Sequence, residues 1–140
     1  MVLDYCSSGD LSLILAQQPD GRFDENIAKF YISELILAIE YLHQHNILYR
    51  DLKPENILIS ELLYFLFLFF IDFFVGEGGD GHIKLADFGL SKEGVGDGDR
   101  TKSFCGSPAY LSPEMVRNKG ASKATDIYGI GELLNNGGIQ

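Results

Sequence analysis

The pattern of apolar and polar positions divides this chain into helices and short strands. Asp24 precedes the longest helical pattern, which continues as far as His43. Its apolar positions recur at near-helical spacing and are Ile27, Phe30, Tyr31, Leu35, Ala38 and Leu42. The spacing predicts a long helix with Asp24 as its cap. A shorter helix is predicted over residues 11–18, between a capping Asp10 and the helix-breaking Pro19.

Three short apolar runs predict strands. Ile47-Leu48 follows the long helix as a short buried strand. Ile57-Leu58-Ile59 and His82-Ile83-Lys84-Leu85 are interpreted as the two strands of a small hairpin. The stretch from Thr125 to Gly131 predicts the start of a further helix.

One stretch between the hairpin strands fits neither pattern. Leu62 to Val75 is apolar except for Asp72 and contains most of the chain's 10 phenylalanines. It is shorter than the about 20 apolar residues of a membrane-spanning helix. Three interpretations stay open for an insert at about residues 61–79. It is a translated non-coding segment, a hairpin extension that docks on another part of the protein, or an element that inserts into a membrane.

Composition narrows the classes of function. The chain has 140 residues, 22% of them charged, and a formal net charge of -9. This acidity argues against nucleic acid or an anionic membrane as the partner. The two cysteines form no disulfide framework, and the amino terminus has no basic segment typical of a signal peptide, so we expect a cytoplasmic chain. The three histidines build no metal cage with the cysteines.

The most informative chemistry lies in residues 49–56, Tyr-Arg-Asp-Leu-Lys-Pro-Glu-Asn. Asp51 can accept a proton from a hydroxyl, and Lys53 can neutralise a phosphate in transfer. Asn56 can bind a magnesium ion, and a second metal-binding residue is expected downstream at Asp87, in Asp-Phe-Gly. Phosphoryl transfer needs positioning and positive charge, and these residue types supply both.

These two motifs resemble the catalytic loop and the metal-binding loop of eukaryotic protein kinases. A third motif, residues 103–114, is similar to the activation segment of that family and to its closing Ala-Pro-Glu. Its Phe-Cys-Gly-Ser-Pro sequence, with Tyr49 in the place of the usual histidine, is similar to the AGC group of serine/threonine kinases. Three motifs in the family's order make the resemblance specific.

The resemblance implies a role for each site residue. Asp51 and Lys53 would be catalytic, and Asn56 and Asp87 would hold Mg²⁺. ATP is the implied nucleotide, and its binding residues would be Asp4, Cys6, Asp10 and Leu58, with Leu3 as the gatekeeper.

A protein or peptide substrate with basic residues is implied as well. Glu55, with Asp10, would bind a basic side chain of the peptide, and Ser107 would line the groove that favours serine and threonine over tyrosine. Two plainer interpretations stay open, in which Glu55 is simply solvated and Asp10 only caps a helix.

Regulation is implied by the activation segment. Ser103 would be phosphorylated by an upstream kinase, and Arg50 and Lys92 would bind the phosphate. The alternative is that Arg50 only pairs with a local carboxylate.

The resemblance further implies an α+β fold, a partial kinase fold made of the hinge and the upper part of the mainly helical large lobe. Residues 1–134 would run from the hinge to the anchoring helix of the large lobe, followed by a tail at 135–140. No glycine loop or ATP-clamping lysine precedes the hinge. The chain is therefore expected to be a serine/threonine kinase fragment, with a catalytically inactive fragment or a binding module as the alternative.

Overall fold

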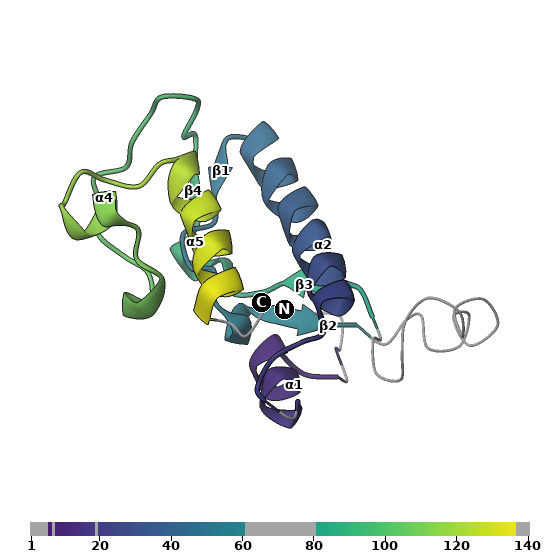
Figure 1. Cartoon of the computed structure of the whole chain (residues 1–140). Helices are drawn as coiled ribbons and strands as arrows, with labels where there is room; N and C mark the ends of the chain where they lie inside the picture. Colours follow the sequence, from purple (N-terminus) through teal and green to yellow (C-terminus); the bar gives the residue numbers. More distant parts are fainter. Residues whose placement is uncertain (1–5, 7, 19, 61–80, 137–140) are drawn as a thin grey trace.

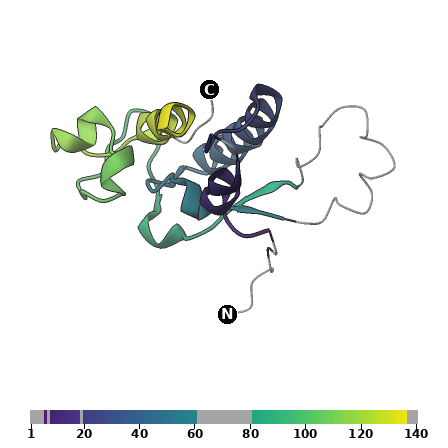
Figure 2. The same cartoon turned by 60° about the horizontal axis from the view of Figure 1, so that its bottom comes forward.

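The structure of the chain is a computed structural model that describes residues 6, 8–18, 20–60 and 81–136. Two long helices, α2 (Glu25–Gln44) and α5 (Lys123–Asn136), lie side by side (Figure 1). The short helix α4 (Pro113–Val116) lies beyond α5, on the side away from α2, and the turned view in Figure 2 shows the same order. The mixed content of helices and small sheets confirms the predicted α+β fold.

The two predicted amino-terminal helices form where their capping residues indicate. Helix α1 (Leu11–Gln17) begins after Asp10, whose carboxylate accepts a hydrogen bond of 3.1 Å from the Leu13 backbone nitrogen. Helix α2 begins after Asp24, whose carboxylate accepts one of 2.9 Å from the Asn26 nitrogen. Each cap satisfies an amide that has no partner within its own helix.

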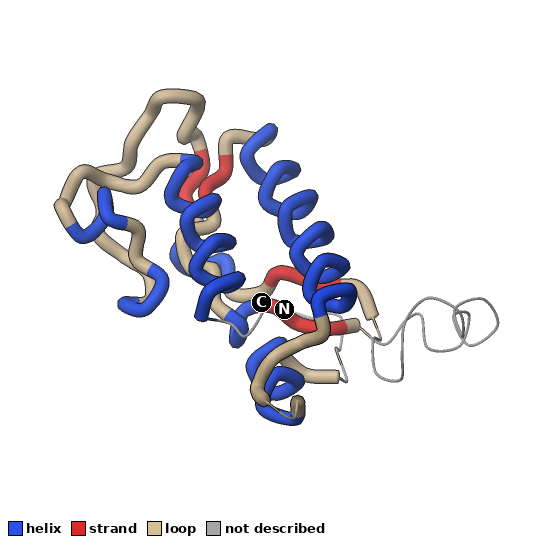
Figure 3. The backbone as a smooth tube through the Cα atoms, viewed as in Figure 1, coloured by secondary structure: helices blue, strands red, loops and turns tan. Residues whose placement is uncertain are grey.

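The strands form two separate antiparallel pairs (Figure 3). Strand β2 (Ile57–Ile59) pairs with β3 (Ile83–Leu85), as the sequence predicts. Strand β1 (Ile47–Leu48) is also confirmed, but its partner β4 (Lys92–Glu93) was not predicted. Lys-Glu has no strand signal of its own, so only the tertiary contact reveals β4.

The main core lies where α1, α2, α5 and the hairpin meet. From α2 it receives Ala28, Tyr31, Leu35 and Ile39, which follow one helical stripe. Phe30, a member of the predicted apolar pattern, is 40% exposed, so the buried stripe is narrower than the sequence pattern. Each large apolar side chain buried here contributes about 1.5–3 kcal/mol.

A second, smaller cluster fixes the segment that follows β4. It consists of Leu48, Val95, Met115 and Ala121, all buried. The Val95 nitrogen also donates a 3.0 Å hydrogen bond to the Asn46 carbonyl, next to β1. These contacts hold Val95, Met115 and Ala121 against β1, the strand that leads into the loop with the predicted catalytic residues.

Parts of the sequence interpretation lie outside the described residues. The insert at 61–79 does, as do Pro19 and residues 1–5 of the predicted hinge strand. Within the described ranges, no helix is long and apolar enough to cross a membrane. The division into residues 1–134 and a tail at 135–140 stays a prediction; helix α5 itself ends at Asn136.

Candidate functional site

The candidate site is built on the loop between β1 and β2. Arg50 has φ 69, a left-handed conformation that is uncommon for a residue other than glycine. Further along the loop, beyond Lys53, residues Pro54–Asn56 form a 3-10 turn with proline at its start. Proline is pre-shaped for that position, because its φ is fixed and the missing N–H is not needed there. The loop therefore turns sharply on either side of Asp51.

Asp51 is the centre of a hydrogen-bond network and is only 5% exposed. Its Oδ1 accepts bonds from the Ser107 hydroxyl at 2.8 Å and the Ser107 backbone nitrogen at 3.1 Å. Its Oδ2 accepts a bond of 2.9 Å from Asn56 Nδ2 and lies 2.9 Å from Lys53 Nζ. The structure thus brings together four residues that the sequence predicts for the site.

These contacts keep Asp51 charged. Burial by itself raises the pKa of the Asp51 carboxyl, but hydrogen bonds from Lys53, Ser107 and Asn56 outweigh burial and hold that pKa below its ordinary value. The bond to Asp51 in turn raises the pKa of Lys53. Asp51 is an anion and Lys53 a cation at neutral pH.

Tyr49 connects this loop to the segment that contains Asp87. Its hydroxyl donates to the Ala86 carbonyl, and its ring meets the Phe88 ring edge-on with centroids 5.3 Å apart. The Ala86 nitrogen donates a 2.9 Å bond to the Asn56 carbonyl. Asp87 is therefore held next to Asn56 through the residue that precedes it.

Asp87 and Asn56 present oxygen atoms that suit a hard cation. Asp87 is exposed, has φ 50, and one of its oxygens accepts a 3.1 Å bond from the Gly89 nitrogen. The amide nitrogen of Asn56 donates bonds of 2.9 Å to the Asp51 carbonyl and carboxylate, so that its amide oxygen is the atom that would bind a cation. No group of three or more acidic, histidine or cysteine side chains in the described ranges could hold a metal. Two oxygen donors fit Mg²⁺, which keeps several waters and shares phosphate oxygens.

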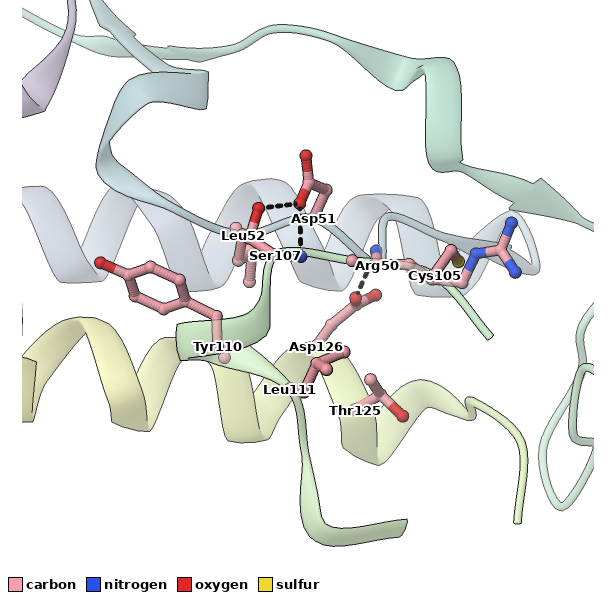
Figure 4. Close-up of a pocket in the computed structure, with 11 residues that line it drawn as sticks. Arg50, Asp51, Leu52, Cys105, Ser107, Tyr110, Leu111, Thr125 and Asp126 are labelled. Carbon is pink, nitrogen blue, oxygen red and sulfur yellow. Dashed lines mark hydrogen bonds between the residues drawn. The ribbon is translucent and has the colours of Figure 1, made fainter. Parts of the chain in front are cut away.

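A glycine allows the segment of residues 103–114 to reach Asp51 (Figure 4). Gly106 has φ 112, and a Cβ there would lie 2.9 Å from the Arg50 carbonyl oxygen. Only glycine fits both the backbone conformation and this close approach. The next residue, Ser107, can then point its hydroxyl at Asp51, as the dashed lines in Figure 4 show.

Arg50 contacts the segment that contains Ser103. Its Nη1 donates a 2.6 Å bond to the Ser103 hydroxyl, and its Nε donates one of 2.6 Å to the Leu90 carbonyl. Ser103 also borders an open cavity whose lining includes Lys92 and Arg100. Arg50 thus contacts Ser103 directly, and Lys92 lines the same cavity as Ser103.

The predicted nucleotide-binding residues are less fully described. Asp4 lies outside the described residues, and Cys6 is partly buried, with its carbonyl accepting a 3.3 Å bond from the Gly9 nitrogen. Asp10 is engaged as the cap of α1, and its backbone bridges to Leu58. Glu55 is exposed on the turn beside Lys53. The nucleotide-binding roles of these residues stay predictions.

Sequence reasoning missed two residues that support the loop from behind. Asp126 of α5 is 2% exposed, and its oxygens accept bonds from the backbone nitrogens of Tyr49 at 3.0 Å and Arg50 at 2.8 Å. His43 Nε2 lies 2.8 Å from Asp126 Oδ2. The sequence did contain a sign of this role for Asp126, which lies on the same helical face as the apolar Ile130 and Leu133. A charged side chain among buried helix positions requires hydrogen-bond partners.

Comparisons with known proteins agree with this arrangement. A family model described as protein kinase domain matches residues 1–136. Serine/threonine-protein kinase sck1 of Schizosaccharomyces pombe is 44% identical over 135 residues, covering 96% of this chain and 16% of that protein. The human cAMP-dependent protein kinase catalytic subunit PRKX is 42% identical over 134 residues, covering 96% of this chain and 31% of that protein.

The rat RAC-beta serine/threonine-protein kinase is 38% identical over 133 residues, covering 95% of this chain and 24% of that protein. These matches confirm the resemblance that the three motifs indicated. The chain spans less than a third of the length of each of these relatives.

Proposed function

The chain belongs to the protein kinase family, and from that premise we propose that it carries the catalytic loop of a serine/threonine kinase. The reaction is transfer of the γ-phosphate of ATP to a serine or threonine hydroxyl. The observation that carries the proposal is the cluster of Asp51, Lys53, Asn56 and Ser107 around one buried carboxylate, with Asp87 next to it.

Asp51 is the residue that receives and orients the substrate hydroxyl. It is charged at neutral pH, since its pKa is below the ordinary value, so it is ready to accept a hydrogen bond. A low pKa makes it a weak base, which suits a reaction in which orientation matters more than early proton removal. Lys53 places a cation 2.9 Å from the same carboxylate, where it can also meet the transferring phosphoryl group.

Mg²⁺ and ATP are the proposed cofactor and nucleotide. Asn56 and Asp87 would supply the protein oxygens, and the ion would offset the negative charge of the phosphates. Asp87 is exposed, so it can reach an ion that is shared with a nucleotide. The adenine contacts proposed for Asp4, Cys6 and Leu58 complete this assignment.

The proposed substrate is a protein segment with basic residues. Glu55 is exposed beside the loop, and its negative charge contributes to the raised pKa of Tyr110 after the larger effect of burial. A lysine or arginine of the substrate would offset that charge. Asp10 is a weaker candidate for this contact, because its carboxylate already caps α1.

Ser103 is the proposed regulatory phosphorylation site. Its hydroxyl already lies 2.6 Å from Arg50 Nη1, and a phosphate there could form a bidentate pair with the guanidinium, with Lys92 assisting. In an active preparation, Ser103→Ala should remove activation by an upstream kinase and leave the unstimulated rate unchanged. Equal activation of both proteins would contradict this role.

A non-catalytic binding module is the second candidate. The observation that favours it is the exposure of large apolar side chains, with Leu37 at 63%, Phe104 at 59% and Phe88 at 48%. Where exposed apolar side chains gather into one contiguous patch, they mark a surface that binds other proteins. This candidate requires no phosphate transfer.

A phosphorylation assay separates the two. The chain is incubated with labelled ATP, Mg²⁺ and a basic serine peptide, with the alanine form of the peptide as the blank. Transfer should stop on chelation of Mg²⁺ and should fall about 10²–10⁴-fold in Asp51→Asn. The matched control is Asp20→Asn, an exposed turn residue, which should keep the full rate. Transfer that survives Asp51→Asn would contradict the proposed role.

A further inference from the structure

Strand β3 has an outer edge that faces a helix and not another strand. It pairs with β2 in a sheet of two strands, and its other edge lies beside α2 (Figure 1). The Ile59 nitrogen donates a 3.0 Å bond to the Gly9 carbonyl, away from β3, so Ile59 and its partner Ile83 are a pair whose amides point in opposite directions. The Ile83 amide therefore needs a partner outside the sheet.

Glu34 of α2 provides that partner. Its Oε2 accepts a 2.8 Å bond from the Ile83 nitrogen, and its Oε1 contacts Nδ1 of His82, the preceding residue. The side chain of Glu34 is 19% exposed. Phe30, one helical turn before Glu34, lies against the His82 ring with centroids 6.1 Å apart. One carboxylate of α2 thus binds two consecutive residues at the start of β3.

The chemistry of this contact determines the tautomer of His82. An ionised carboxylate only accepts hydrogen bonds, so the proton between Glu34 Oε1 and the His82 ring lies on Nδ1. The His82 carbonyl in turn accepts bonds from the Ser60 nitrogen at 3.0 Å and the Ser60 hydroxyl at 3.1 Å. His82 is therefore held by α2 through its ring and by the end of β2 through its backbone.

We propose that Glu34 is a positioning residue that fixes β3 on α2, and with it the segment that leads to Asp87. In a tight hairpin the turn sets the register of the two strands, but here residues 61–80 separate them, and so long a connection imposes no register. The register of this hairpin therefore depends on contacts outside the connection, and Glu34 supplies two of them.

The segment after β3 shows what this positioning achieves. Ala86 follows the strand, and its nitrogen donates a 2.9 Å bond to the Asn56 carbonyl, which brings Asp87 next to Asn56. If β3 moves against α2, this bond weakens, and the two oxygen donors proposed for Mg²⁺ lose their fixed separation. The consequence for Mg²⁺ rests on the function proposed above; the positioning itself does not.

Amide hydrogen exchange of the whole chain, followed by NMR, tests the proposal without ATP or Mg²⁺. Glu34→Ala removes both acceptor oxygens and keeps a good helix former in α2. The Ile83 amide should then exchange about 10- to 100-fold faster, the loss typical of a hydrogen bond to a charged group. The Ala86 amide should also exchange faster, by a smaller factor. The Val95 amide, which bonds to the Asn46 carbonyl, should not change.

The matched control is Glu40→Ala, which removes an exposed carboxylate from the same helix. It should leave the Ile83 and Ala86 amides unchanged, and an effect equal to that of Glu34→Ala would overturn the proposal. An unchanged Ala86 amide in Glu34→Ala would reduce the contact to a local bond and would overturn it as well. Equal acceleration at Ile83, Ala86 and Val95 would make Glu34 a general stabilising residue, with the same consequence.

Glu34→Gln provides a readout that a purely structural role would not move. Glutamine keeps one acceptor oxygen for the Ile83 amide but presents an N–H to the His82 ring in place of the other oxygen. Slow exchange at Ile83 and Ala86 should return, while the His82 proton should move from Nδ1 to Nε2. The nitrogen chemical shifts of the ring report this at about pH 8, where an ordinary histidine is neutral. Exchange as fast as in Glu34→Ala, or an unchanged tautomer, would contradict the proposal.

The unmodified protein provides a further measurement if Glu34→Ala does not fold. Its His82 ring should have the proton on Nδ1, and a proton mainly on Nε2 would overturn the proposal. These measurements remain interpretable in a chain without kinase activity. Absence of phosphate transfer with the expected exchange pattern would refute the proposed function alone. An active chain whose Ala86 amide does not respond to Glu34→Ala would refute the inference alone.

Discussion

Asp51 is charged although water reaches little of its side chain. Burial alone would raise the pKa of the Asp51 carboxyl. Hydrogen bonds from Lys53, Ser107 and Asn56 stabilise the charged form and lower that pKa. A group whose pKa is lower in the folded state binds fewer protons there than in the unfolded chain. It therefore contributes stability above the unfolded pKa, and that contribution is lost as the pH falls through the folded pKa.

We expect this dependence to appear in acid. For the native chain, the free energy of unfolding should decrease as the pH falls below about 4, the ordinary pKa of an aspartate. Asp51→Asn should flatten the decrease, because the amide does not titrate. Urea unfolding at a series of pH values measures this.

Asp97→Asn is the control for the acid prediction. Asp97 lies 2.7 Å from Lys123 Nζ, but its side chain is 92% exposed. Exposed ion pairs contribute little, so this variant should follow the native curve closely. An equal slope in the native chain and in Asp51→Asn would contradict the expectation.

We expect Tyr49 to make the free energy of unfolding depend on pH in the alkaline range. Burial, followed by the nearby Asp51 charge, raises the pKa of its hydroxyl, so the folded state keeps the proton more firmly than the unfolded one. The contribution is complete below about pH 10, the ordinary pKa of tyrosine, and is lost as the pH rises above it. Tyr49→Phe should remove this loss and, at neutral pH, lower the free energy of unfolding by about 0.5–1.5 kcal/mol.

Urea unfolding at neutral and alkaline pH checks the Tyr49 prediction. Tyr41→Phe is the matched control, since Tyr41 is 63% exposed and should behave like the native chain. Lys53, whose pKa is raised by Asp51, still titrates in the Tyr49 variant, so some alkaline loss remains. A native-like alkaline loss in Tyr49→Phe would count against the role of burial.

At the scale of elements, a single glycine allows α5 to pack closely on the loop that contains Asp51. A Cβ on Gly129 would lie 3.2 Å from Leu52 Cβ and 3.4 Å from Leu52 Cδ1, whereas a Cβ on Gly131 would meet nothing within 4 Å. Both residues are within the same helix. Gly129 therefore allows α5 to approach Leu52, and Gly131 is free of that constraint.

Gly131→Ala and Gly129→Ala should change the free energy of unfolding in opposite directions. Gly131→Ala should raise the free energy of unfolding by up to about 1 kcal/mol, because alanine favours helix more than glycine does. Gly129→Ala gains the same helix preference but forces Leu52 to move, which costs about 1–3 kcal/mol. Urea unfolding of the two variants provides the comparison. Equal stabilisation by both would show that Leu52 yields without cost.

At the scale of the whole molecule, the hairpin closes before residues 61–80 begin. The Ser60 nitrogen donates a 3.0 Å bond to the His82 carbonyl, next to the pair Ile59 and Ile83. From α2, a Glu34 oxygen accepts a 2.8 Å bond from the Ile83 nitrogen. The hairpin thus has its own closing contacts.

A chain in which one asparagine replaces residues 61–80 should therefore fold. The junction reads Ser-Asn-Gly-His, and Asn-Gly favours the two-residue turn that joins antiparallel strands. The shorter connection should raise the free energy of unfolding by about 2 kcal/mol through a smaller loop-closure entropy. Urea unfolding and the amide spectrum of the hairpin check it; loss of the Ile59 and Ile83 signals would contradict it.

The sequence by itself determined the local elements and the chemical types of the site. Asp10 and Asp24 marked the helix starts because capping is a local interaction. Three motifs in order indicated the family: the loop with Asp51, Lys53 and Asn56, the Asp-Phe-Gly at Asp87, and residues 103–114.

Only the tertiary structure decided what holds that loop. The pairing of β1 with β4, the approach of Ser107 to Asp51, and the contacts of Asp126 with His43 and the loop backbone join residues far apart in the chain. No pattern in the sequence indicated that these particular partners meet. Their meeting depends on how the helices pack, and packing is a property of the whole fold.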